Sequence, residues 1–262
     1  MLNENTLSIG RDSTRRFSDR VANYQLYRPG YPEIVLEVLR KEANLSPEDV
    51  IADIGSGTGI SSKLFLENGN QVFGVEPNLE MRQAAEAFLS DFPQFTSVDG
   101  TAEATTLESH SVDVVLAAQA FHWFVIERAK QEFIRVLRPD GWLVLLWNVR
   151  LTDATPFLVA YEALLHKFCP EYGALDHRQF NDAIIQSLFA PGKMTRHILK
   201  SEQEHDLQSL TGLLLSASYT PPPGDPKHEP MLRELERVFE EHGVNGRVKF
   251  LYHVKLFFGK LL

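Results

Sequence analysis

The stretch VIADIGSGTGI, which spans Val50–Ile60, decides the fold. Its first five residues form an apolar run typical of a buried strand. Three glycines on alternate positions follow, and glycine permits tight turns and close approach to a ligand. Helical spacing begins after Gly59. The stretch therefore predicts a strand, a tight loop and a helix whose first backbone N–H groups are available to a ligand.

Apolar runs and helical spacings alternate outward from this stretch, along residues 45–150. The predicted strands are 50–54, 71–75, 95–99, 112–118 and 142–147. The predicted helices between them are 60–68, 79–92 and 126–137, the second capped by Asn78 and the third stopped by Pro139 and Gly141. This alternation indicates a parallel sheet covered on both faces. We therefore predict a doubly wound α/β core.

Two flanking segments complete the expected single domain. Residues 1–44 hold a polar start, a short helix, the turn RPGYP at 28–32 and a helix over 32–43. Three tyrosines in this segment, Tyr24, Tyr27 and Tyr31, predict a lid that folds over the site and faces the substrate. Residues 151–262 are expected to complete the sheet and to line part of a pocket. The predicted elements there are helices at 155–168, 182–188, 206–216 and 231–242, strands at 194–205 and 247–258, and a proline-rich loop at 220–230.

Composition narrows the class of protein. The chain has 262 residues, 44% hydrophobic and 23% charged, which fits a folded globular protein. The formal net charge of −9 argues against a nucleic-acid or membrane partner. A lone cysteine, Cys169, and nine histidines without ligand spacing predict neither a disulfide nor a metal site. Short apolar runs and an N-terminus without an apolar signal core predict a cytoplasmic protein, monomer or homodimer.

Glu76 supplies the second half of the site signal. It lies 76 − 55 = 21 residues after Gly55, at the end of the second predicted strand, where a carboxylate can accept both ribose hydroxyls of an adenosine. The cofactor is then NAD or S-adenosylmethionine. The spacing GxGxG differs from the GxGxxG of pyrophosphate-binding turns. Asp53 would repel a pyrophosphate, and no second nucleotide-binding half follows. These points favour S-adenosylmethionine, with an NAD-dependent oxidoreductase as the alternative.

The chain resembles the class I S-adenosylmethionine-dependent methyltransferases of the type 11 family, near the trans-aconitate methyltransferase-like group. The resemblance covers residues 17–150 well and the remainder loosely. It implies a Rossmann-like doubly wound, seven-stranded sheet, mostly parallel with the last strand antiparallel, with helices on both faces and an N-terminal helical lid. The motifs that carry it are VIADIGSGTG at 50–59, VFGVEPN at 72–78, GTAEA at 100–104, VDVVLAAQAFHWF at 112–124 and VLRPDGWLVLLWN at 136–148.

The resemblance also implies a cofactor site. Asp53 would bond to the methionine amino group, directly or through water, Glu76 would hold the ribose hydroxyls, and Arg28 would pair with the cofactor carboxylate. Thr101 stands where many relatives carry aspartate, and its hydroxyl is a weaker acceptor for the adenine amine. The remaining implied contacts are Gly55, Gly57, Thr58 and Gly59 beneath methionine and ribose, Pro77 and Met81 near adenine, Thr101, Ala102 and Glu103 at the adenine edge, and Ala118 and Gln119 at the methionine end.

His122 and Trp123 follow the fourth predicted strand, where relatives of this fold meet the acceptor. His122 is the candidate base or orienting group, and Trp123 would close the pocket around an apolar acceptor. No run of cationic residues marks a strongly anionic acceptor. The predicted activity is in-line methyl transfer to a small molecule, at a carboxylate or hydroxyl, with S-adenosylhomocysteine as product. A non-catalytic protein that binds either sulfur nucleotide is the other alternative, while the acidic balance disfavours a macromolecular acceptor.

Overall fold

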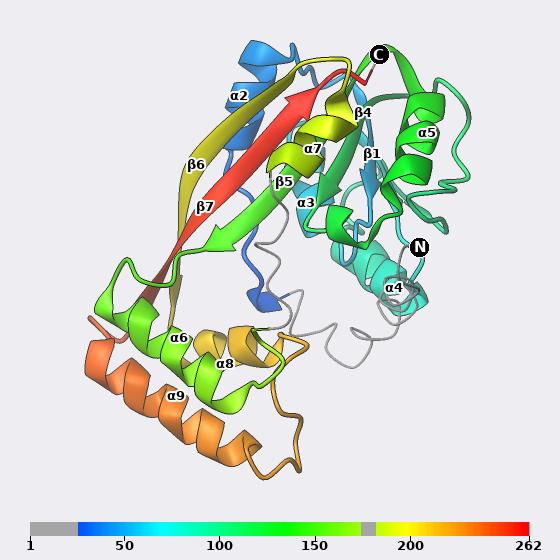
Figure 1. The fold of residues 1–262 in the computed structure, drawn as a ribbon. Helices are drawn as coiled ribbons and strands as arrows, with labels where there is room; N and C mark the ends of the chain where they lie inside the picture. Colours follow the sequence, from blue (N-terminus) through cyan, green and yellow to red (C-terminus); the bar gives the residue numbers. More distant parts are fainter. Residues whose placement is uncertain (1–25, 174–181, 262) are drawn as a thin grey trace, which may run out of the picture.

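A seven-stranded sheet forms the centre of the computed structural model, which describes residues 26–173 and 182–261 (Figure 1). The strand order is β3-β2-β1-β4-β5-β7-β6. Of these strands, β7 runs antiparallel to both of its neighbours. The prediction of a mostly parallel sheet with an antiparallel last strand is therefore confirmed. The strands are β1 (Val50–Ile54), β2 (Gln71–Val75), β3 (Phe95–Val98), β4 (Val112–Ala118), β5 (Leu137–Arg150), β6 (Met194–His205) and β7 (Val248–Gly259).

Helices cover both faces of the sheet because the central strands bury both of their faces. In β4, Val114 and Leu116 join the apolar core beneath α2 and α3, whereas Val115 and Ala117 join the core beneath α5 and α7. This explains why β4 is a nearly continuous apolar run. The described helices are α2 (Ile34–Glu42), α3 (Ile60–Glu67), α4 (Leu79–Phe88), α5 (Ile126–Val136), α6 (Pro156–Phe168), α7 (Asp182–Phe189), α8 (Leu207–Leu215) and α9 (His228–His242), with a 3-10 turn, η4 (Phe121–Trp123).

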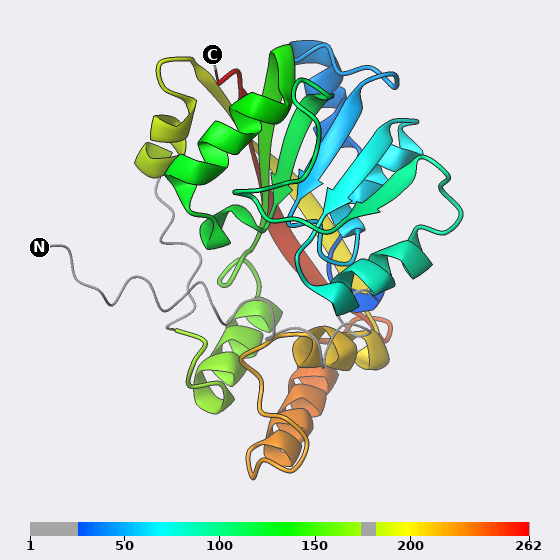
Figure 2. The same cartoon turned by 90° about the vertical axis from the view of Figure 1, so that its right-hand side faces the viewer.

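A third apolar core holds α6, α8 and α9 beside the long strands β6 and β7. Phe250 of β7 packs edge-on against Phe157 and Tyr161 of α6, with ring centroids 5.1 Å and 5.0 Å apart. Leu210 of α8 and Leu235 of α9 are fully buried in the same core. The three helices thus form a layer beyond the carboxyl end of β5 (Figures 1 and 2). Strands β6 and β7 complete the sheet, while the division of the chain at 44 and 150 stays a prediction.

The junction of α5 and β5 differs from the prediction. The strand was expected at 142–147 after a break at Pro139 and Gly141, but it begins at Leu137, directly after α5. Leu137 pairs with Val112, and the register then shifts before Val114. A proline is tolerated at such an irregular part of a ladder because no regular N–H bond is lost there.

Two helix boundaries were also mispredicted. The expected loop at 220–230 ends early, because α9 begins at His228 and takes Pro230 into its first turn. The first N–H groups of a helix have no partner within it, so proline fits there. The helix expected over 79–92 ends at Phe88. Its predicted cap is confirmed, since the Asn78 side chain accepts from the N–H of Met81 at 2.9 Å.

The predicted N-terminal lid lies mainly outside the described residues, and so does Tyr24. The described part of this segment begins at Leu26. Its Tyr27 ring lies against Gly212 of α8, where a Cβ would come within 2.1 Å of it. In the part of the chain that the structure describes, no helix has the length and apolar character needed to cross a membrane.

The loop between β1 and α3 takes a left-handed path. Its glycines Gly55, Gly57 and Gly59 have φ angles of 69°, 56° and 83°, values that L-residues with a side chain adopt at a penalty. The N–H of Gly55 donates to the carbonyl of Val75 at 2.8 Å and ties the loop to β2. The alternate glycines are therefore explained by the positive φ angles that this loop requires.

Replacing Gly59 by alanine is expected to destabilise the fold more than replacing Gly57. Both changes carry the left-handed penalty of roughly 1–2 kcal/mol. At Gly59 the added Cβ would also lie 2.6 Å from Leu89 Cδ1, whereas no atom beyond the chain neighbours lies within 4 Å at Gly57. Overpacking adds roughly 1–3 kcal/mol. Urea denaturation of both variants measures the difference, and equal losses would contradict this packing.

Candidate active site

A cavity of about 530 Å³ opens at the carboxyl ends of β1, β2, β4 and β5. Such an edge is where open α/β sheets bind ligands. Helices α6 and α8 supply its opposite wall through Tyr161 and Leu213. Most of the residues predicted from the sequence line it: Arg28, Tyr31, Gly55, Gly57, Thr58, Glu76, Pro77, Met81, Thr101, Ala102, Glu103, Ala118, Gln119, His122 and Trp123.

The Glu76 carboxylate is hydrogen-bonded to the glycine loop. Its Oε2 accepts from the N–H of Gly57 at 3.0 Å, and its Oε1 accepts from the N–H of Asn78 at 2.9 Å. Burial raises the pKa of Glu76, while these two bonds and the nearby Arg82 oppose that shift. Each carboxylate oxygen has a second lone pair. Glu76 can therefore accept two further hydrogen bonds from a ligand in the cavity.

Asp53 lies behind the cavity wall and not on it. Its side chain is fully buried, and its Oδ2 accepts from Ser61 and Ser62, each Oγ at 2.7 Å. Within the described chain its Oδ1 is buried and has no hydrogen-bond partner. Burial raises the pKa of Asp53 to about 6. Ser61 also lines the cavity. Its hydrogen bond to Asp53 therefore links the buried carboxylate to the cavity.

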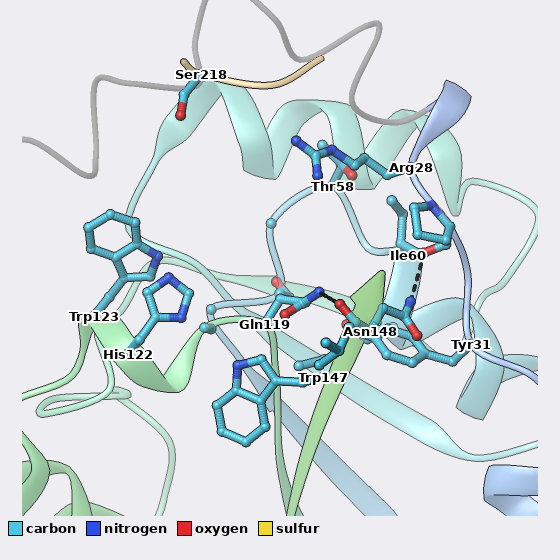
Figure 3. Close-up of a pocket in the computed structure, with 18 of the residues that line it drawn as sticks. Arg28, Tyr31, Thr58, Ile60, Gln119, His122, Trp123, Trp147, Asn148 and Ser218 are labelled. Carbon is cyan, nitrogen blue, oxygen red and sulfur yellow. Dashed lines mark hydrogen bonds between the residues drawn. The ribbon is translucent and has the colours of Figure 1, made fainter. Parts of the chain in front are cut away.

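A hydrogen-bonded chain joins the N-terminal turn to the strand ends (Figure 3). Gln119 Nε2 donates to the carbonyl of Asn148 at 3.0 Å. Asn148 Nδ2 lies within hydrogen-bond distance of the carbonyls of Pro29, at 3.3 Å, and Gly30, at 3.1 Å, and Figure 3 draws the first of these. Gln119 has a φ of 58°, a strained value for a residue with a side chain. Asn148 was not predicted as a site residue, although its place at the end of β5 could have indicated it.

The turn η4 places two aromatic side chains at one end of the cavity. The rings of His122 and Trp123 lie 4.8 Å apart at 45°, and both residues line the cavity beside Gln119 (Figure 3). Glu103 Oε1 accepts from the N–H of Val125 at 2.7 Å, so it anchors the segment that follows the turn. This end of the site is built from β4 and the residues directly after it.

Cationic residues gather in the cavity although the sequence shows no cationic run. Arg28, Arg150 and Lys255 all line it, from the N-terminal turn, the end of β5 and the middle of β7. Four tyrosines that the sequence analysis did not single out join them: Tyr161, Tyr172, Tyr219 and Tyr252.

Comparison with known proteins agrees with this geometry. Residues 52–145 match the family model described as a methyltransferase domain. An uncharacterised methyltransferase of Schizosaccharomyces pombe is 33% identical over 58% of this chain and 60% of its own length. An uncharacterised methyltransferase of Mycobacterium bovis is 40% identical over 53% of this chain and 55% of its own length. These matches identify residues 52–145 as a methyltransferase domain.

Structural neighbours extend the match in fold alone. A structure assigned as a type II methyltransferase, from Anaeromyxobacter dehalogenans, has a TM-score of 0.63 at 21% identity over 90% of this chain and 99% of that one. A phosphoethanolamine N-methyltransferase of Haemonchus contortus, solved with S-adenosylhomocysteine, has a TM-score of 0.53 at 14% identity over 95% and 58%. The matched part spans about 60% or less of the curated relatives above. The finer likeness to the trans-aconitate methyltransferase-like group stays a prediction.

The residues of this methyltransferase domain fit the cofactor of its class, S-adenosylmethionine. The Gly57 backbone faces open space, while a Cβ on Gly55 would lie 2.6 Å from Ala120 Cβ. Thr58 lines the cavity. Its Oγ1 is buried and has no hydrogen-bond partner in the described chain. A hydroxyl in that situation is suited to bond a ligand, because an unpaired buried polar group is unfavourable.

The buried Asp53 carboxyl makes stability depend on pH. Its pKa is about 6 in the fold and about 3.9 in the unfolded chain. The fold therefore binds the proton more tightly, and the associated stability is present below about pH 4 and lost as the pH rises through 6. We expect the stability of the wild type, relative to Asp53→Asn, to fall by roughly 2 kcal/mol between about pH 4.5 and about pH 7. Urea denaturation at both pH values measures this, and a difference independent of pH would contradict it.

Proposed function

We propose that the chain is an S-adenosylmethionine-dependent methyltransferase that acts on a small-molecule acceptor. The observation that supports this most directly is the pairing of Glu76 with the N–H of Gly57 on the cavity wall. A glycine loop and a carboxylate from the next strand, joined in this way, form an adenosine-binding edge. A cavity of about 530 Å³ is within the usual range for small-molecule sites.

The cofactor half of the cavity divides its tasks among three side chains. Glu76 would accept the ribose hydroxyls with the lone pairs that its backbone bonds leave open. Arg28, which lines the same cavity (Figure 3), would pair with the cofactor carboxylate. Asp53 would attract the ammonium through Ser61, since its buried carboxylate gains from any nearby positive charge.

The mechanism depends mainly on position. Bound S-adenosylmethionine supplies a methyl group already activated by a positively charged sulfur. The enzyme residues must hold the acceptor atom in line with the S–CH3 bond, and such orientation contributes roughly 7–11 kcal/mol. A general base adds ~10²–10⁴-fold, or about 3–5 kcal/mol. His122 would accept a proton from the acceptor or orient it, and Trp123 beside it would exclude water.

Calorimetric titration with S-adenosylmethionine, S-adenosylhomocysteine and NADH tests the cofactor. We expect binding of the two sulfur nucleotides and none of NADH. Binding of NADH alone, or of none of the three, would overturn the proposal. Turnover of the methyl donor with an acceptor separates an enzyme from a non-catalytic binding protein.

Glu76→Gln is expected to weaken S-adenosylhomocysteine binding by at least tenfold with the fold retained. The amide replaces one acceptor oxygen by a donor, so a ribose hydroxyl and a backbone N–H lose a partner. Asp99→Asn is the matched control, because Asp99 stands at the same edge of the sheet and its side chain is 75% exposed. Equal affinities for all three proteins would show that Glu76 does not hold the ribose.

His122→Ala is expected to leave the affinity for S-adenosylhomocysteine within about twofold and to lower kcat by 10²–10⁴-fold if the acceptor must lose a proton. Calorimetry and steady-state kinetics give the two values separately. An unchanged kcat would show that His122 only supports the turn η4.

A further inference from the structure

Arg150 is a buried cation at the acceptor end of the cavity that the cofactor does not explain. Its side chain is 17% exposed. Its Nη2 donates to Glu162 Oε2 and to the Tyr172 hydroxyl, the latter at 2.9 Å. Its Nη1 is also buried and has no hydrogen-bond partner among the described residues. The Nη2 group is thus fixed by the protein, and the Nη1 group is left for a ligand.

The surroundings of Arg150 hold it in place. Its guanidinium lies 5.0 Å from the centre of the Tyr161 ring. The Tyr172 hydroxyl donates to Glu162 at 2.9 Å, so Arg150, Glu162 and Tyr172 bond mutually. All these partners come from α6 or the residues just after it, on the wall opposite the glycine loop. A side chain held by three contacts has little freedom to seek another partner.

Glu162 is the anionic partner of Arg150, and His166 Nε2 lies 3.4 Å from Glu162 Oε1. Burial raises the pKa of Tyr172 and of Tyr252 to about 12, so both hydroxyls stay neutral at pH 7. Arg28 also acts on Tyr219 and Tyr252, but it is already assigned to the cofactor carboxylate. A ligand at Arg150 would therefore meet an unpaired Nη1 group and not a surplus of positive charge.

An unpaired buried N–H group is unfavourable, and a charged one more so. A carboxylate supplies acceptor oxygens that match guanidinium N–H groups. A phosphate dianion suits the site less well, because Glu162 already offsets part of the arginine charge. The tyrosine rings around the guanidinium favour an unsaturated or aromatic carbon body next to that carboxylate.

We propose that Arg150 binds a carboxylate group of the methyl acceptor and so orients the acceptor toward the cofactor. This inference rests on the proposed function. The methyl-accepting atom is a different group of the same molecule, because a carboxylate bonded to a guanidinium has its lone pairs engaged and is a weak nucleophile. In transfer, that second group forms the new bond to the methyl carbon, the C–S bond electrons stay on sulfur, and any proton leaves toward His122.

Acid and amide probes of equal shape test the anchor. We would titrate 3-phenylpropionate, 4-hydroxyphenylacetate and their primary amides against the protein, with and without saturating S-adenosylhomocysteine. The variants are Arg150→Gln and the double variant Arg150→Gln/Glu162→Gln, which avoids leaving Glu162 as an unpaired buried charge. Arg138→Gln is the matched control, because Arg138 also lies on β5 and pairs with Asp113, yet it lies outside the cavity.

We expect each acid to bind the wild type and the Arg138 variant at least tenfold more tightly than its amide. We expect this ratio to fall below about threefold in both Arg150 variants, with the affinity for S-adenosylhomocysteine unchanged. Equal binding of acid and amide by the wild type would overturn the proposal, and so would a ratio that survives without Arg150. A loss of S-adenosylhomocysteine affinity in the Arg150 variants would reassign Arg150 to the cofactor carboxylate.

Failure of the proposed function is visible separately. If the wild type bound no S-adenosylhomocysteine, the methyltransferase proposal would fall, while the acid-to-amide ratio without nucleotide would still decide whether Arg150 binds carboxylates.

Discussion

The site depends on one carboxylate that bonds two strand-to-helix junctions at once. Glu76 directly follows β2. Its two oxygens accept from the N–H of Gly57, after β1, and from the N–H of Asn78, before α4. The left-handed turn at Gly57 is favoured by the absence of a side chain, and it aims that N–H at Glu76. The loop, the helix α3 that follows it and the cavity wall are all positioned by this pairing.

This arrangement buries the carboxylates of Asp53 and Glu76, although burial disfavours their charged forms. Burial raises the pKa of both Asp53 and Glu76, and the charge of Asp53 adds to the shift of Glu76. An ammonium and a pair of hydroxyls would relieve that cost, because each gives the carboxylates a partner. The raised pKa of both carboxylates and the proposed affinity for a cationic nucleotide therefore have the same origin.

The sequence predicted the parts whose signal is local. β1, β2 and β4 were predicted to the residue, since strands buried on both faces are apolar runs between clear breaks. Pro139 and Pro230 led to wrong boundaries, because the rules for proline assume a regular ladder or a helix interior. Pro139 lies instead where the register of β5 is irregular, and Pro230 lies in the first turn of α9. Most residues that line the cavity beside the glycine loop were likewise predicted, since they follow β1, β2, β3 and β4 in order. Their role in binding the cofactor stays a prediction. Arg150 was missed, as its partners Glu162 and Tyr172 approach it only when α6 docks on β7.

The two halves of the cavity are thus built in different ways, and the mechanism explains how this can work. Orientation contributes roughly 7–11 kcal/mol to such a reaction, and a base about 3–5 kcal/mol. The cofactor half must hold one molecule in one pose, which a few contiguous motifs can do. The acceptor half needs only to place a nucleophile along one line, and any anchor of the right charge at the right distance achieves that. Orientation of the reactants lowers the larger part of the barrier. An ion pair assembled from β5 and α6 can therefore orient the acceptor without any change to the glycine loop.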